Sequence, residues 1–217
     1  LNVRDRDMGG FVNEAKEVLN KELAPSLPKG YYYSWSGQWE NQERAKQRLQ
    51  IILPIVFLVI FLMLYFVYKN FLEAGLVMLS VPFALIGGVY YMSILGLNFS
   101  VAIWVGFIAL YGVAVETGVI MVIYLHEALD KKLIEKNGIL SQQDLIDATE
   151  EGAILRLRPK LMTVATAMIG LIPVMWATGT GSDLAKPLAV PLIGGILTSA
   201  IHVLFVTPVI FVMIKEQ

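Results

Sequence analysis

The stretch FSVAIWVGFIALYGVAVETGVIMVIYLH, residues 99–126, decides the fold of this chain. A membrane-spanning helix needs about 20 predominantly apolar residues, and this stretch is longer than that. Its one carboxylate is Glu116, and no Lys, Arg, Asp or Glu occurs from Ala74 to Val115. A charge at such depth costs at least ~2.5–3.5 kcal/mol, so it is usually kept where it faces a bundle interior or a water-filled path. We therefore expect Glu116 to handle an ion or a proton. The structural alternative is a protonated Glu that hydrogen-bonds a neighbouring helix.

The composition is that of a membrane protein. Hydrophobic residues make up 56% and charged residues 16% of the 217 residues, whereas soluble domains carry roughly 25% charge. The absence of cysteine excludes a disulfide framework and a thiolate metal site. The net charge of −1 gives no indication of nucleic-acid binding. Because the chain begins at Leu1 without the features of a signal peptide, we expect it to be a piece of a longer protein.

Uncharged runs predict five transmembrane helices and one polar loop. The loop, 127–158, predicts a short helix that ends at Asn137-Gly138 and a second helix that begins with the capping-box pair Ser141 and Asp144. Prolines 191 and 208 predict kinks in the last span. The predicted spans are 51–68, 74–95, 99–126, 161–182 and 187–214.

The polar part before the spans predicts a small helix-and-strand remnant. Residues 7–23 have apolar positions at helical spacing. Tyr31–Ser36 alternates as a strand does, and Leu1–Val3 fits the tail of another strand. Gly37 breaks the strand, and the polar helix 38–50 leads directly into the first span. One helix with one or two strands cannot bury a core, so this part needs partners outside the sequence.

Basic residues predict the orientation of the spans. With five alternating spans, most basic residues near the span ends fall on one side of the membrane, and the short loops on the other side contain a single basic residue, Lys186. The positive-inside rule therefore places 127–158 in the cytoplasm and residues 1–50 outside. The basic residues on the cytoplasmic side are Lys69, Lys131, Lys132, Lys136, Arg156, Arg158 and Lys215.

Small residues around Glu116 predict a crowded interior. Ala114 and Gly118 form a small-xxx-small pair that lets another helix approach closely, and Gly112 lies one turn before Glu116. Plain helix packing and a mechanical role both explain these glycines. The scattered methionines fit core filling better than a thioether path for a soft metal.

Other polar groups inside the spans are few. For Lys160, spacing alone favours a side chain that snorkels to the headgroups over one that pairs with Glu116. Thr163, one turn further along, is either a relay hydroxyl or a packing hydroxyl. His202 is expected to hydrogen-bond a neighbouring group, and His126 to lie at the interface. The sequence contains no P-loop, Ser-His-Asp set or HExxH motif, and it identifies no metal ligands.

Five motifs in this chain resemble those of the resistance–nodulation–division (RND) transporters, specifically the heavy-metal efflux branch of Cus/Czc type. They occur in order along essentially the whole chain, which makes the resemblance specific. The motifs are SGQWE (36–40), SVPFALIGG (80–88), GFIALYGVAVE (106–116), LRLRPKLMT (155–163) and GTGSD (179–183).

The resemblance implies an all-α polytopic membrane bundle with a small α+β periplasmic remnant. Members are about five times this length, and this chain is similar to their C-terminal end. Residues 1–37 would finish a periplasmic pore subdomain, 38–50 would connect, and the eighth to twelfth membrane helices would follow. Members work in the bacterial inner membrane as homotrimers with a periplasmic adaptor and an outer-membrane channel, are driven by protons, and need no cofactor.

The resemblance also implies roles for individual residues. In the heavy-metal branch a Glu of the tenth helix and a Lys of the eleventh belong to the proton relay, with an Asp of the fourth helix. Glu116 and Lys160 occupy those positions, which reverses the preference for Lys160 as a snorkelling residue. Thr163 matches a relay threonine of the drug-exporting branch. The Asp partner lies outside this chain.

One departure bears on the transported ion. Monovalent copper and silver pumps place a Met shortly after the Gly-Thr-Gly-Ser-acid motif, where this chain has Ala185. Zn(II), Co(II), Ni(II) and Cd(II) therefore remain open as substrates. The alternative functions are a drug- or lipid-exporting pump of the same superfamily and a proton-coupled export or assembly factor that transports nothing. A membrane enzyme would need a second catalytic residue facing Glu116.

Overall fold

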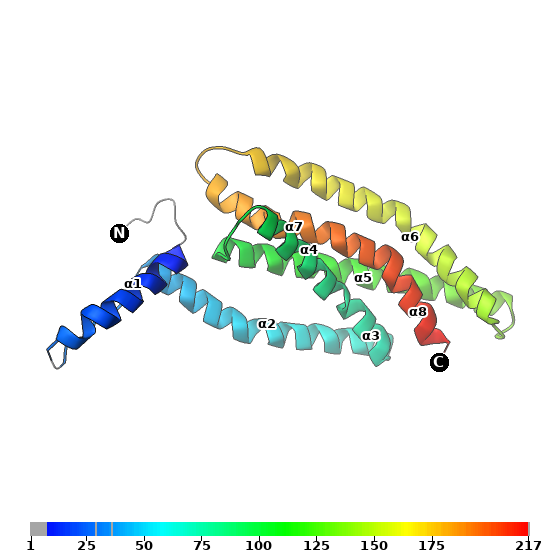
Figure 1. The fold of residues 1–217 in the computed structure, drawn as a ribbon. Helices are drawn as coiled ribbons and strands as arrows, with labels where there is room; N and C mark the ends of the chain where they lie inside the picture. Colours follow the sequence, from blue (N-terminus) through cyan, green and yellow to red (C-terminus); the bar gives the residue numbers. More distant parts are fainter. Residues whose placement is uncertain (1–7, 29, 36, 217) are drawn as a thin grey trace. The chain divides into compact units, whose positions relative to one another are not determined.

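The structure is a computed structural model that describes residues 8–28, 30–35 and 37–216. The chain divides into two compact units, Leu1–Ile55 and Val56–Gln217. The regular elements of the described residues are helices (Figure 1), in agreement with the predicted all-α bundle. The possible strand tail at Leu1–Val3 lies outside the described residues.

The N-terminal unit contains α1 (Met8–Glu22), the short 3-10 helix η1 (Ala24–Ser26) and the start of α2 (Gln38–Tyr68). Helix α1 forms where the helical spacing predicts it. The predicted strand at 31–36 is wrong for the described residues 31–35, which form no strand. A strand needs a neighbour to receive its backbone hydrogen bonds, and the described residues offer no second strand.

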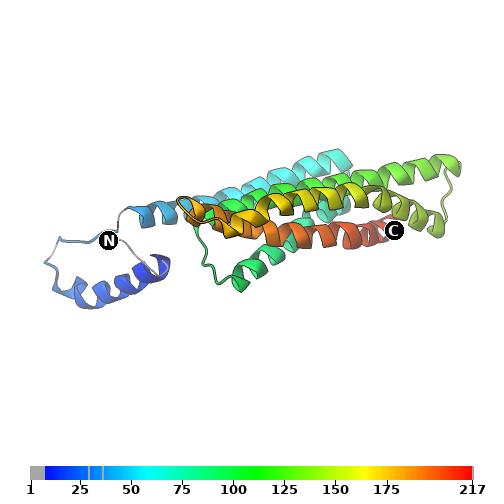
Figure 2. The same cartoon turned by 90° about the horizontal axis from the view of Figure 1, so that it is seen from above.

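The second unit is a helix bundle. In the described part of the chain, five helical segments are long and apolar enough to cross a membrane. Figures 1 and 2 show α5 and α6 running together to a turn that lies beyond the end of α8. After α2, the elements are α3 (Phe71–Met78), α4 (Ser80–Ile94), α5 (Val101–Glu135), α6 (Gln142–Leu171), η2 (Ile172–Trp176), α7 (Ser182–Ile201), the π-helix η3 (His202–Val206) and α8 (Thr207–Lys215).

The two helices predicted within 127–158 are not separate elements. Helix α5 continues without a break past His126 to Glu135, and α6 runs from Gln142 through Pro159 to Leu171. No Gly or Pro interrupts the chain from 119 to 135, so nothing local ends α5 at the predicted point. The turn between them is as predicted: Asn137 and Gly138 have positive φ, and Ser141 and Asp144 form both hydrogen bonds of a capping box.

Prolines mark the interruptions of the second and fifth spans. The second span is divided into α3 and α4, and Pro82 lies in the first turn of α4. The fifth span contains the π-helix η3 directly before Pro208, which lies in the first turn of α8. A helix tolerates proline in its first turn because the missing N–H has no partner there. Pro191, by contrast, lies within continuous α7.

The fourth span ends earlier and the fifth begins earlier than predicted. The last turn of the fourth span is the 3-10 helix η2, which ends at Trp176. The predicted turn at 179–183 contains Gly179 and Gly181, both with positive φ. Helix α7 begins directly afterwards at Ser182.

Close contact between helices depends on small residues. A Cβ atom added to Gly194 of α7 would meet the backbone oxygen of Gly87 in α4, and one added to Gly106 of α5 would lie 2.5 Å from the Leu188 oxygen. The Ala114–Gly118 face of α5 also packs closely, since the Ser80 hydroxyl donates to the Ala114 carbonyl at 3.0 Å. The predicted close approach of a neighbouring helix at this pair is therefore confirmed.

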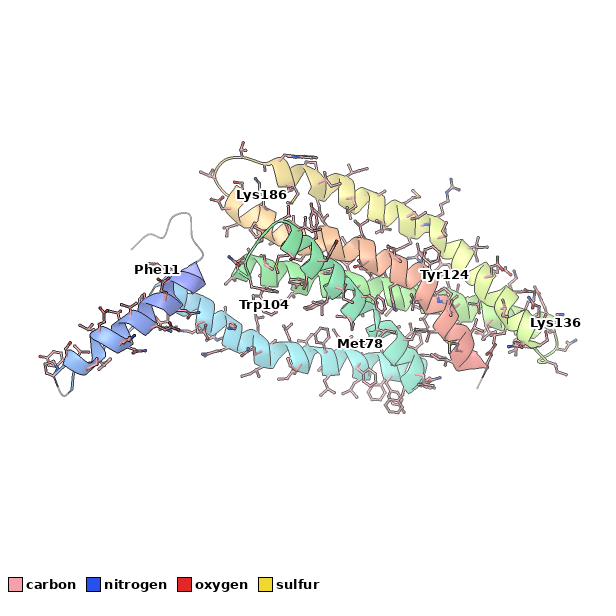
Figure 3. The ribbon with its side chains drawn as sticks, viewed as in Figure 1. Phe11, Met78, Trp104, Tyr124, Lys136 and Lys186 are labelled. Atoms are coloured by element: carbon pink, nitrogen blue, oxygen red, sulfur yellow. The ribbon has the colours of Figure 1, made fainter. Side chains whose placement is uncertain are left out.

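The two ends of the bundle are marked by labelled side chains in Figure 3. Lys136 lies at the α5–α6 turn, while Lys186 lies at the opposite end, where Trp104 stands in the first turn of α5. Lys136 forms an ion pair with Asp144 at 3.2 Å. The functional groups discussed below lie between these ends or beside the C-terminus of α8.

Candidate functional site

A cavity of about 210 Å³ lies between α5, α6 and the α7–η3 segment. It brings together three side chains singled out from the sequence: Glu116, Lys160 and Thr163. Arg156 adds a second cation to its wall. The remaining lining residues are Val113, Thr117, Ile120, Ala167, Ile196 and Val203.

Lys160 is buried, with 4% of its surface exposed. Helix α6 begins 18 residues earlier, at Gln142, which is about 27 Å along the helix axis. The side chain therefore lies among helices instead of at a helix end. Pairing of Lys160 with Glu116 across the cavity stays a prediction. Arg156, one turn earlier, lies over the ring of Tyr124 at 5.2 Å.

Glu116 lines the same cavity from α5, and its remaining surface is exposed in this chain. Within the described residues it forms no salt bridge with Lys160, although the two charges interact across the cavity. The expected crowding is only partly present, because an added Cβ at Gly112 would meet nothing within 4 Å. The carboxylate therefore has one side toward the two cations and another side open for groups outside this chain.

The threonine hydroxyls are bonded within their own helices. The Thr163 hydroxyl donates to the Pro159 carbonyl at 2.9 Å, and the Thr117 hydroxyl donates to the Ala114 carbonyl at 3.0 Å. A hydroxyl oxygen can still accept a hydrogen bond while it donates one. The Thr163 hydroxyl oxygen can thus accept a hydrogen bond from a donor in the cavity while it keeps its bond to Pro159.

His202 does not behave as expected. Its side chain is 1% exposed, and neither ring nitrogen has a hydrogen-bond partner among the described residues. The ring stacks on Phe83 of α4 with centroids 4.2 Å apart. The expected hydrogen bond to a neighbour is wrong here, since the ring packs against an aromatic face instead.

A second charged cluster was missed by sequence reasoning, which left Glu73 between the predicted spans 51–68 and 74–95 without a role. Glu73 is 2% exposed, and its carboxylate contacts Lys215 Nζ at 2.7 Å and His126 Nε2 at 3.2 Å. The predicted topology does contain a signal, since it ends three spans near these residues on one side of the membrane. Nothing in the local sequence, however, indicates that the carboxylate is buried.

The described residues contain no group of three or more His, Asp or Glu side chains that could hold a metal ion. Ala185, the position of the expected thioether step, lies in the first turn of α7. Met121 is fully buried in the hydrophobic core, in agreement with the view of methionine as core filler.

Comparisons with known proteins agree with this architecture. Residues 1–215 match the AcrB/AcrD/AcrF family. The chain is 39% identical over 209 residues to the cation efflux system protein CusA of Escherichia coli strain K12, covering 96% of this chain and 20% of that protein. It is 39% identical over 210 residues to the cobalt-zinc-cadmium resistance protein CzcA of Cupriavidus metallidurans, covering 97% and 19%.

A solved structure gives the same result for the fold. The crystal structure of a heavy metal efflux pump (crystal form II) superimposes with a TM-score of 0.78 at 36% identity, over 100% of this chain and 20% of that one. The chain spans about one fifth of the length of these relatives. The sequence motifs, the five membrane-length helices and these matches together show that the chain belongs to the AcrB/AcrD/AcrF family of RND transporters, among relatives of the heavy-metal efflux branch.

Proposed function

We propose that this chain supplies the proton-relay helices of a proton-driven pump that exports heavy-metal cations across the cell envelope. The single observation that carries the proposal is the cavity in which Glu116 of α5 faces the buried Lys160 of α6. The whole pump would be a homotrimer in the bacterial inner membrane, with a periplasmic adaptor and an outer-membrane channel. Residues 1–50 would lie on the periplasmic side.

The chemistry of the cavity is the gain and loss of one charge. An ionised Glu116 is attracted to Lys160 and Arg156, so it favours close contact of α5 and α6. Two unit charges 4 Å apart interact by about 4 kcal/mol at an effective dielectric constant of 20. Proton uptake by Glu116 removes this attraction, so α5 and α6 are released from close contact. Release of the proton restores the first arrangement.

One charge pair does not suffice for a complete switch. Moving a two-state equilibrium from 1:99 to 99:1 takes about 5.5 kcal/mol, which exceeds a single pair at that distance. The open side of Glu116 is where another group would act. The resemblance to the family supplies such a group, an Asp of the fourth membrane helix that is not in this chain.

Divalent ions are the proposed substrates. Relatives of this chain include proteins whose names specify cobalt, zinc, cadmium and nickel, and Ala185 stands where the monovalent pumps have a Met. A metal-tolerance panel tests this proposal. Cells that lack their own metal exporters and carry the full-length parent should tolerate zinc, cobalt, nickel or cadmium, and the Ala185→Met variant should add tolerance to silver or copper. Tolerance to bile salts and dyes without any metal phenotype would instead indicate a drug exporter.

Lys160 provides a separate prediction. We expect Lys160→Met to lower divalent-metal export to the level of cells without the pump, because Glu116 then loses its buried partner. Lys160→Arg should retain part of the activity, since it keeps the charge. The measurement is uptake of radioactive zinc into everted membrane vesicles driven by a pH gradient, with pump amounts matched by immunoblot. Full zinc uptake by Lys160→Met would contradict the proposed pairing of Lys160 with Glu116.

A further inference from the structure

A buried carboxylate ties three helices together beside the C-terminus of α8. Glu73 of α3 accepts from Lys215 of α8 at 2.7 Å and contacts His126 of α5 at 3.2 Å. The Asn70 side chain donates to the same carboxylate at 3.5 Å. We call Glu73, His126 and Lys215 the Glu73 cluster. Glu73 is 2% exposed, and burial of a carboxylate is costly unless it is paired and hydrogen-bonded in this way.

The ring of His126 faces two hydrogen-bond acceptors. Its Nδ1 lies 3.0 Å from the carbonyl oxygen of Val122, and its Nε2 lies 3.2 Å from the second carboxylate oxygen of Glu73. A neutral imidazole has one donor nitrogen, whereas an imidazolium donates from both. Lys215 Nζ contacts the other oxygen of the Glu73 carboxylate, so both contacts of the ring are hydrogen bonds donated to an acceptor only when His126 carries a proton on each nitrogen.

The surroundings of His126 allow that proton to exchange. The ring is 28% exposed and lines a cavity of about 740 Å³ together with Asp130, Lys215 and Glu216. From α6 the cavity receives Gln142, which donates to Glu216 at 2.8 Å.

Aromatic rings fix the orientation of the imidazole. Tyr68 of α2 stacks on it with centroids 6.0 Å apart, and Phe211 of α8 meets it edge-on at 5.2 Å. The Tyr68 hydroxyl donates to the Val119 carbonyl of α5 at 3.1 Å. The ring is therefore held with Nε2 toward Glu73 while its charge is free to change.

We propose that Glu73 is a positioning residue for α5, the helix that carries Glu116, and that its hold on α5 is strongest when His126 is protonated on both nitrogens and weaker when His126 is neutral. This inference rests on the proposed function for its role in transport, because α5 is the relay helix only in that proposal. His126 follows Glu116 by ten residues, or about 15 Å along α5. The Glu73 cluster thus makes the position of the relay helix depend on the pH at the end of α5 where the basic residues gather. Histidine is suited to this task because its charge ordinarily changes between pH 5 and 8.

Thermal unfolding of the purified full-length pump tests the pH-dependent hold of the Glu73 cluster on α5 without any metal. Stability supplied by a charged His126 is present at acidic pH and is lost as the pH rises. The Tm difference between wild type and His126→Gln should therefore be larger at pH 5.5 than at pH 8.5, by about 1 °C for a protein about five times this length. The double variant His126→Gln/Glu73→Gln should show no more pH dependence than Glu73→Gln alone, because the two residues act through one contact.

The matched control is Glu151→Gln, which makes the same chemical change in the ion pair of Lys131 with Glu151 at 2.8 Å, where both side chains are exposed. It should leave the pH profile of wild type unchanged. If Glu73→Gln does not fold because Lys215 is left unpaired, the His126→Gln comparison still decides the matter. A Tm difference between wild type and His126→Gln that is the same at pH 5.5 and 8.5 would overturn the proposal, because a merely structural histidine would give that result.

A transport measurement separates this inference from the proposed function. Proteoliposomes loaded with the full-length pump should take up Zn²⁺ with a rate that depends on the pH of the face that bears His126, and His126→Gln should flatten that dependence. Absence of Zn²⁺ uptake by wild type counts against the proposed function alone, because the Tm comparison tests the role of the Glu73 cluster separately. Zn²⁺ uptake with identical pH profiles in both proteins would contradict the proposed role of the Glu73 cluster and would still support the proposed export function.

Discussion

Replacing Glu116 by Gln should abolish metal export by the full-length pump and leave its trimer assembled. Gln keeps the size and hydrogen-bonding capacity of the side chain but removes the charge that Lys160 and Arg156 face across the cavity. The alternation between an attracted and a released state of α5 and α6 then cannot occur. Folding should persist because much of the Glu116 side chain is exposed in this chain and forms no ion pair within the described residues.

The measurement compares metal tolerance of cells carrying wild type or Glu116→Gln, with trimer content checked by size-exclusion chromatography of the purified proteins. We expect the Glu116→Gln cells to be as sensitive as cells without the pump. The matched control is Glu150→Gln, the same change at an exposed position of α6, which should export normally. Normal tolerance with Glu116→Gln would end the proton-relay proposal, whereas loss of the trimer would show that Glu116 is structural.

Replacing Gly194 by Ala should strongly destabilise the bundle. The added Cβ would meet the backbone oxygen of Gly87 and would lie 2.7 Å from the Tyr91 Cβ and 2.9 Å from the Gly87 carbonyl carbon. Backbone atoms cannot rotate away as a side chain can, so α4 and α7 must move apart. Overpacking of this kind typically costs about 1–3 kcal/mol, and the lost contacts along the α4–α7 interface add to it.

Thermal unfolding of the purified full-length pump in detergent measures this effect. Gly194→Ala should lower Tm and reduce the recovered trimer. Gly75→Ala on α3 is the matched control, because an added Cβ at Gly75 would meet nothing within 4 Å and alanine is about 1 kcal/mol more favourable than glycine in a helix. Its Tm should equal or exceed that of wild type. Equal Tm values for all three proteins would mean that α4 and α7 do not depend on this close contact.

The sequence predicts those features that depend on short-range chemistry. Each uncharged run of sufficient length lies in a helical segment that is long enough to cross a membrane, although the second and fifth segments are interrupted. The capping box at Ser141 and the positive-φ turn at Asn137 and Gly138 form as their local preferences require. The bounds of α5 and α6 were less predictable, because a helix does not end where its surroundings change from apolar to polar unless a breaker is present.

The sites depend on contacts between distant segments. Spacing along one helix favoured a snorkelling Lys160, and the family resemblance reversed that preference; only the packed helices show that the side chain is buried beside the cavity. Glu73 is 53 residues from His126 and 142 from Lys215 in the sequence, and no local pattern links them.

The sequence by itself determined that this chain is a membrane-helix bundle with one carboxylate deep in its third span, because apolar length and the cost of a buried charge are properties of each segment alone. The tertiary structure decided which charged groups meet. It placed Glu116 opposite Lys160 and buried Glu73 between His126 and Lys215. The physical reason is that a helix presents several faces, and only packing against other helices decides which face encloses a polar group.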